Sequence, residues 1–110
     1  TFTQLANQFK TVASAVTLSS SSATATLDFT ASAVFQITLP SDATNTTINY
    51  SNQVIGMTKV IKITGSGGSG TPTITGTKLS GTLSQTNNTV NYIQVTCIGA
   101  SEFIYTISQA

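Results

Sequence analysis

The sequence lacks most of the side chains on which enzymes depend. Its 110 residues include no histidine, no arginine and no tryptophan, and only three side-chain carboxylates, Asp28, Asp42 and Glu102. General acid–base catalysis uses histidine or paired carboxylates, and metal sites use histidine, cysteine or clustered carboxylates. Asp28 is expected on an outward strand face and Asp42 in a turn, so nothing brings the carboxylates together. We therefore predict that the protein is not an enzyme and has no catalytic residue, cofactor or metal site.

A single cysteine, Cys97, excludes an internal disulfide bond. It occurs in the segment IQVTCI, where Ile93, Val95 and Cys97 share one face of an expected strand. A thiol in this position is usually a small buried apolar group, and the chain has no histidine that could activate it. We predict that Cys97 belongs to the core.

Charge is scarce. Charged residues make up 6% of the chain and the net charge is +1. Four lysines supply few phosphate contacts, and no apolar run is long enough for a membrane-spanning helix. Serine and threonine account for about a third of the residues, a composition more usual in extracellular or particle-surface β-proteins. We predict no nucleic-acid binding and no membrane insertion.

The segment GSGGSG, Gly65–Gly70, matches the G-x-G-x-x-G pattern of dinucleotide-binding turns. That pattern needs a helix directly after the glycines, because the pyrophosphate binds at the helix N-terminus. The residues that follow, TPTITGTKLSG, are rich in threonine and contain proline and two glycines, which disfavour a helix. We predict that Gly65–Gly70 is a flexible loop between two strands.

Residues 1–18 differ from the rest of the chain in their apolar spacing. Apolar side chains recur every three or four residues, which predicts an amphipathic helix. They are Phe2, Leu5, Phe9, Val12 and Val16. So short a helix is unstable alone and is expected to dock or oligomerise. It either covers one end of its own domain or forms the end of a stalk or an anchor, and Ser19–Ser22 follows as a linker.

From residue 23 the apolar pattern changes to a period of two, which indicates β-strands. The strong segments are ATATLDF, VFQITLP, TTINY, TKVIKIT, VNYIQVTCI and EFIYTIS, and the weaker, edge-like ones are TPTIT and TKLSG. Short strands separated by short polar turns predict a mainly β fold, an antiparallel β-sandwich or jelly roll over residues 23–110, preceded by the N-terminal helix. No internal repeat or second domain is visible.

A carbohydrate site is the remaining chemical alternative. Tyrosines and asparagines occur near expected loops, and the candidate glycan contacts are Tyr50, Asn52, Asn88 and Tyr92. The favoured interpretation is that the tyrosines are ordinary strand residues and the asparagines form turns. Three N-x-S/T triplets, at Asn45, Asn49 and Asn87, matter only if the protein passes through a glycosylating pathway.

The strand series resembles a domain found in appendage proteins of tailed bacteriophages. The segments that carry the resemblance are Leu27–Asp28–Phe29, Phe35–Ile37–Leu39, Thr46–Asn52, Gly56–Ile63, Gly65–Gly70, Asn91–Cys97 and Phe103–Ile107, within residues 23–108. The family often has a tryptophan in the middle strand and another near the end, and this chain has neither. No surface contact is therefore transferred from the family.

The resemblance implies a non-enzymatic structural protein on the virion surface: a tail fibre, a head fibre or a capsid decoration. It also implies a homotrimer. As a virion component the chain is expected to contact other virion proteins, and contact with a host-surface glycan through loops stays an open alternative that the resemblance does not supply. The alternatives are a subunit of an extracellular filament or adhesin, and a carbohydrate-binding module.

Overall fold

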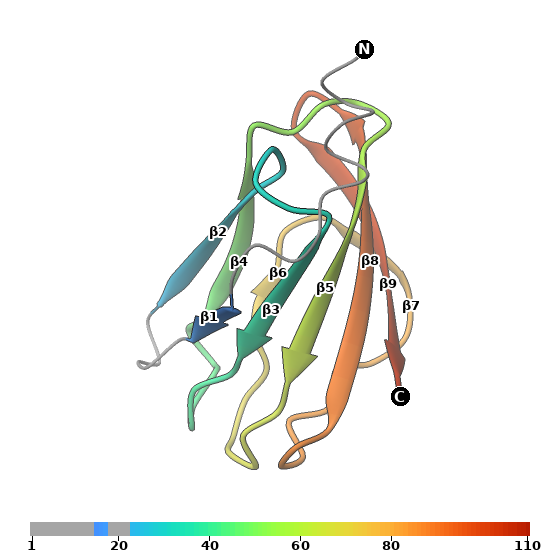
Figure 1. Ribbon diagram of the computed structural model, residues 1–110. Coiled ribbons are helices and arrows are strands. Elements are labelled where there is room, and N and C mark those ends of the chain that lie inside the picture. The colour runs from blue at the N-terminus through green and yellow to red at the C-terminus, as the bar shows by residue number, and fades with distance from the viewer. Residues whose placement is uncertain (1–14, 18–22) are drawn as a thin grey trace.

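The computed structural model describes residues 15–17 and 23–110, and this part of the chain is built from β-strands in two sheets (Figure 1). The six-stranded sheet contains, in spatial order, β1 (Ala15–Thr17), β3 (Val34–Thr38), β5 (Thr58–Thr64), β8 (Val90–Gly99), β9 (Glu102–Gln109) and β7 (Thr77–Ser80). The three-stranded sheet contains β2 (Thr24–Asp28), β4 (Thr47–Ser51) and β6 (Thr73–Ile74). The mainly β prediction is confirmed, and each expected strand segment occurs.

Successive strands alternate between the two sheets from β1 to β6 (Figure 1). Because the chain crosses to the other sheet after each of these strands, neighbours within a sheet run in the same direction. β1, β3 and β5 pair in parallel, and so do β2, β4 and β6. The arrangement is solenoid-like, since each coil adds one strand to each sheet.

The prediction of an antiparallel sandwich or jelly roll is therefore wrong for most of the strand pairs. Antiparallel pairing occurs between β5 and β8 and between β8 and β9, where the expected turn GAS joins the last two strands. β7 is the edge strand of the six-stranded sheet and pairs in parallel with β9.

The core lies between the two sheets. It is filled by every second residue of the strands, the one whose side chain points toward the other sheet. β5 shows the pattern clearly, because every second residue from Lys59 to Ile63 is buried and the residues between are half-buried. The three-stranded sheet contributes Ala25, Leu27, Ile48, Tyr50 and Ile74, and the six-stranded sheet contributes Phe35, Ile37, Ile61, Ile63, Ile93, Val95, Cys97, Phe103 and Ile107. Burial of these apolar surfaces is the main force that holds the layers together.

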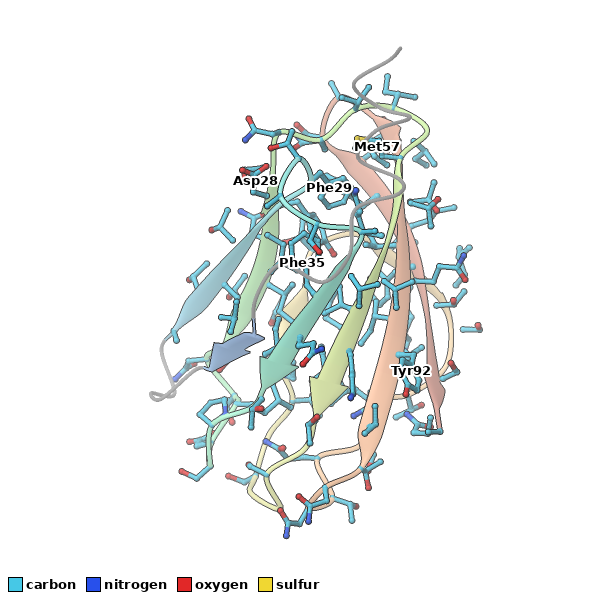
Figure 2. The ribbon with its side chains drawn as sticks, viewed as in Figure 1. Asp28, Phe29, Phe35, Met57 and Tyr92 are labelled. Atoms are coloured by element: carbon cyan, nitrogen blue, oxygen red, sulfur yellow. The ribbon has the colours of Figure 1, made fainter. Side chains whose placement is uncertain are left out.

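Three aromatic rings join the sheets near one end of the core. Phe29 contacts Tyr50 and Phe103 edge-on, at ring-centroid distances of 5.5 Å and 6.0 Å, and Tyr50 and Phe103 lie 4.3 Å apart. Lys59 is fully buried beside them, with its Nζ 6.0 Å from the centroid of the Phe29 ring. The labelled side chain of Phe29 can be followed between the layers in Figure 2.

The two ends of the stack differ in their loops. At one end, here called the glycine-loop end, residues 39–46, 65–72 and 81–89 are joined by backbone hydrogen bonds. Ser69 donates to Ser41 O at 2.9 Å, and Gly67 donates to Gln85 O at 2.8 Å. The opposite end, here called the entry end, contains residues 52–57 and 99–101, and Gly56 donates there to Cys97 O at 2.8 Å.

The N-terminal segment departs from its prediction where the structure describes it. Residues 15–17 form β1, so the predicted helix is wrong at Val16, whose half-buried side chain packs against the core opposite Ile37. Phe2, Leu5, Phe9 and Val12 lie outside the described residues, as does the linker Ser19–Ser22.

Candidate functional site

The four candidate glycan contacts do not form a common surface. Tyr50 is 7% exposed, and its hydroxyl donates to Thr75 O at 2.9 Å. Asn52 lies at the entry end and donates to Asp28 Oδ1, whereas Asn88 lies at the glycine-loop end. Tyr92 projects from the outer face of β8 (Figure 2). Tyr50 and Asn52 lie toward the entry end, and Asn88 and Tyr92 lie toward the glycine-loop end, so the four residues are divided between the two ends of the stack.

The backbone positions of these residues agree with the favoured interpretation. Tyr50 and Tyr92 are strand residues, in β4 and β8. Asn52 and Asn88 have φ angles of 54° and 63°, the left-handed conformation that asparagine tolerates better than most residues.

Gly65–Gly70 is a loop between β5 and β6, as predicted, and the segment after it is a strand. It is not a free linker, because backbone from both neighbouring loops lies against it. A Cβ on Gly68 would collide with the carbonyl of Ser41, and one on Gly65 would lie 2.5 Å from Thr86 O. The glycines thus permit close packing of three loops.

The three carboxylates occupy separate places. Asp28 Oδ1 accepts hydrogen bonds from the amide and hydroxyl of Thr30 at 2.8 Å and 2.6 Å. Asp42 lies at the glycine-loop end, where hydrogen bonds from the Thr44 side chain and backbone lower the pKa of its carboxyl group. Glu102 is exposed at the start of β9. Within residues 15–17 and 23–110, no group of histidine, cysteine and carboxylate side chains has the arrangement of a metal site.

Cys97 is 1% exposed and belongs to the core, as predicted. Its Sγ lies 3.1 Å from Gly99 O, at the end of β8. A thiol enclosed in this way is a packing residue.

A candidate binding feature is a hollow where the three-stranded sheet ends. That sheet stops at β6, but the six-stranded sheet continues through β9 and β7, so part of its inner face is left uncovered. The hollow has a volume of about 150 Å³. Its apolar lining is Pro72, Ile74, Leu83 and Ile107, and its polar lining is Thr71, Lys78, Thr82 and Tyr105.

Two polar side chains of this hollow lie side by side on neighbouring strands. Lys78 of β7 is the register partner of Tyr105 of β9, and directly opposed residues point to the same side of a sheet. Tyr105 is also opposite Val95, which is fully buried, so its side chain lies on the inner face. The Tyr105 phenol is protonated at neutral pH, as an ordinary tyrosine is, and burial raises its pKa further, so its hydroxyl can donate a hydrogen bond.

Sequence reasoning missed this hollow. TKLSG was identified as an edge-like segment. The parallel pairing that places Lys78 beside Tyr105 cannot be inferred from the residue pattern of TKLSG or of EFIYTIS. The alternation in EFIYTIS does place Phe103, Tyr105 and Ile107 on one face, and that was the available signal.

No family model matches the chain, and comparison with curated proteins and with solved structures finds no significant match. In the described part of the chain, no helix has the length and apolar character needed to cross a membrane.

Proposed function

We propose that the chain is a non-enzymatic structural module of a bacteriophage virion, displayed on the particle surface as part of a tail fibre, a head fibre or a capsid decoration. One observation carries this proposal: six strands stack in parallel and alternate between two sheets. In such a stack the backbone hydrogen bonds connect each coil to the next, which suits a rigid, extended part of a fibre. The segments behind the family resemblance lie in this stack, in its Gly65–Gly70 loop or in the β8–β9 hairpin.

Exposed apolar side chains at the entry end support a docking role for the N-terminal segment. Val54, Ile55 and Ile98 are 41%, 61% and 48% exposed. Gly56 and Gln53 donate hydrogen bonds to Cys97 O and Ala100 O, so the loop of residues 52–57 is held beside the end of β8. These three apolar residues are here called the entry patch.

The direction of β1 indicates the end of the stack from which the chain reaches this strand. β1, β3 and β5 are parallel, and β5 begins directly after the loop of residues 52–57. The chain therefore enters β1 from the side of the entry patch. The apolar positions Phe2, Leu5, Phe9 and Val12 precede this point, and we propose that they dock on the entry patch of a neighbouring copy in a homotrimer.

The oligomeric state tests this assembly. Light scattering of the full chain is expected to give the mass of a trimer, and Leu5→Ser and Ile98→Ser are each expected to shift it toward the monomer. Leu79→Ser is the matched control, because Leu79 is 60% exposed in β7, at the far edge of the sheet. A monomeric wild-type chain, or equal dissociation in the control, would contradict the proposed interface.

Location on the particle tests the virion role separately. An antibody raised against the domain is expected to label purified parent particles at regular positions in electron micrographs. Absence of the protein from washed particles would refute a structural role in the virion, whatever its oligomeric state.

A further inference from the structure

We propose that the hollow between β6, β7 and β9 is a binding site for a carboxylated sugar unit such as a uronic acid residue. The inference goes beyond the structural role and does not depend on a virion location. It rests on the shape of the hollow, the chemistry of its lining and the position of one ammonium group.

The shape favours a single small ring. A hollow of about 150 Å³ is smaller than the 300–1,000 Å³ typical of sites that enclose drug-sized ligands. It is formed by residues of two sheets, because the inner face of β9 continues past the last strand of the three-stranded sheet. A peptide segment would project far beyond such a hollow, whereas one sugar unit of a chain can enter it.

The lining combines apolar surface with hydroxyl groups. Pro72, Ile74 and Leu83 provide apolar surface, which matches the C–H face of a pyranose ring. The side chains of Thr71, Thr82 and Tyr105 provide hydroxyls that can donate to and accept from the sugar hydroxyls. Within residues 15–17 and 23–110 the Tyr105 hydroxyl has no hydrogen-bond partner, so a ligand can use it.

The charge of the hollow selects an acidic sugar. Among the described residues that line the hollow, Lys78 is the only charged one, and its exposed side chain lies beside Tyr105 in the β7–β9 register. The described residues contain no carboxylate paired with Lys78. An ammonium and a phenol hydroxyl side by side can hold the two oxygens of a ligand carboxylate with charge-assisted hydrogen bonds.

The test is titration of the full-length, isotope-labelled protein with D-glucuronate, D-glucose and acetate, followed by amide chemical shifts. D-Glucuronate is expected to shift the amides of Lys78, Thr82 and Tyr105 in a saturable manner. D-Glucose is expected to bind about tenfold more weakly, because it lacks the carboxylate that Lys78 holds. Acetate is expected to cause smaller shifts than either sugar, because it lacks a ring to cover the apolar lining.

Variants distinguish this site from general anion binding. Lys78→Met is expected to reduce the affinity for D-glucuronate to that for D-glucose, and Tyr105→Phe to weaken both. Lys62→Met is the matched control. Lys62 and Tyr92 also form a lysine–tyrosine pair on adjacent strands, but this pair is on the outer face and does not line the hollow.

Two results would overturn the proposal. One is the absence of saturable shifts with D-glucuronate, or an equal response to acetate. The other is an unchanged response in Lys78→Met, or an equal loss in Lys62→Met, provided that the amide spectrum of β8 shows that the variants remain folded.

Discussion

Single buried polar residues fix parts of this fold that apolar packing leaves undetermined. Asn91 is fully buried on the inner face of β8, and its amide group makes four hydrogen bonds. Its Nδ2 donates to the carbonyls of Ile63 and Ser84, and its Oδ1 accepts from Ser84 N and Gln109 Nε2. One side chain thereby connects β5, the loop of residues 81–89 and the C-terminal end of β9.

The first prediction concerns this amide. Asn91→Leu should lower the free energy of unfolding by about 3 kcal/mol or more, because buried backbone groups of Ile63 and Ser84 lose their partner. Urea unfolding monitored by circular dichroism measures the change. Asn49→Leu is the control, since Asn49 is exposed on β4 and should change stability by about 0.5 kcal/mol or less. Equal effects of the two substitutions would show that the Asn91 hydrogen bonds contribute little.

Thr46 differs from Asn91, because it is a fully buried polar residue whose side-chain oxygen, Oγ1, makes no hydrogen bond among the described residues. Thr46→Val replaces the hydroxyl with a methyl group of similar size, so it should raise the free energy of unfolding by about 1 kcal/mol. Thermal unfolding should show a higher midpoint. A lower midpoint would mean that the hydroxyl has a partner in solution, such as a bound water.

At the scale of elements, close packing of the three loops at the glycine-loop end holds the coils in register. The loop of residues 65–72 lies between the other two, and side chains add to its backbone bonds. Gln85 Oε1 accepts from Ser66 N at 2.8 Å, and Ser66 Oγ donates to Pro40 O at 2.9 Å. The Gly65–Gly70 segment is therefore an element of structure, and its glycines are required for contact.

Gly68→Ala tests this packing. The added methyl group would collide with the Ser41 carbonyl, which belongs to backbone and cannot rotate away. Overpacking of this kind typically costs about 1–3 kcal/mol, and the loss should appear as a lower midpoint of urea unfolding. Gly99→Ala is the comparison, because its methyl group would meet mainly the flexible Glu102 side chain and should cost less. If Gly68→Ala proved as stable as the wild type, the loop would have to be free to move.

The strands themselves were predictable, and their pairing was not. Alternation in TKVIKIT and VNYIQVTCI reports which residues face the core, and β5 and β8 follow it. A single buried face is usual for antiparallel sheets, whereas parallel sheets are mostly buried on both faces, so the pattern favoured the wrong pairing. The stacked residues Ala25, Ile48 and Ile74 are unevenly spaced along the chain, which is why no repeat was visible.

The candidate site was hidden for a related reason. The hollow exists because β6 ends the three-stranded sheet early and β7 pairs with β9, two facts about distant segments. Lys59 shows the same limit at a single position, since its place on the inner face follows from the alternation but its full burial does not. Local patterns report the inside and the outside of a strand, and they do not report where a sheet stops.

At the scale of the whole molecule, stability depends on contact between the two sheets, and Tyr50 takes part in that contact. Its ring packs on Phe29 and Phe103, and its hydroxyl donates to Thr75 O directly after β6. Burial, followed by the nearby Tyr105 hydroxyl, raises the pKa of Tyr50 well above its ordinary value of 10.0. The folded protein therefore keeps this proton at a pH where the unfolded chain releases it.

Alkaline unfolding follows from that difference. Below about pH 10 both states hold the proton, so this group gives no pH dependence. Above pH 10 the unfolded state binds fewer protons than the folded state, so the free energy of unfolding should fall, by up to about 1.4 kcal/mol per pH unit from this group. Urea unfolding at neutral pH and in steps above pH 10 would measure the slope.

Tyr50→Phe separates this effect from general alkaline damage. The variant loses the hydrogen bond to Thr75, so it should be about 1 kcal/mol less stable than the wild type at neutral pH. Its stability should then fall less steeply above pH 10, since no buried phenol at this position remains to be ionised. Tyr92→Phe, on the outer face, is the matched tyrosine control, and all three proteins share the same lysines. An equally steep fall in Tyr50→Phe and wild type would show that the pH dependence arises from groups other than Tyr50.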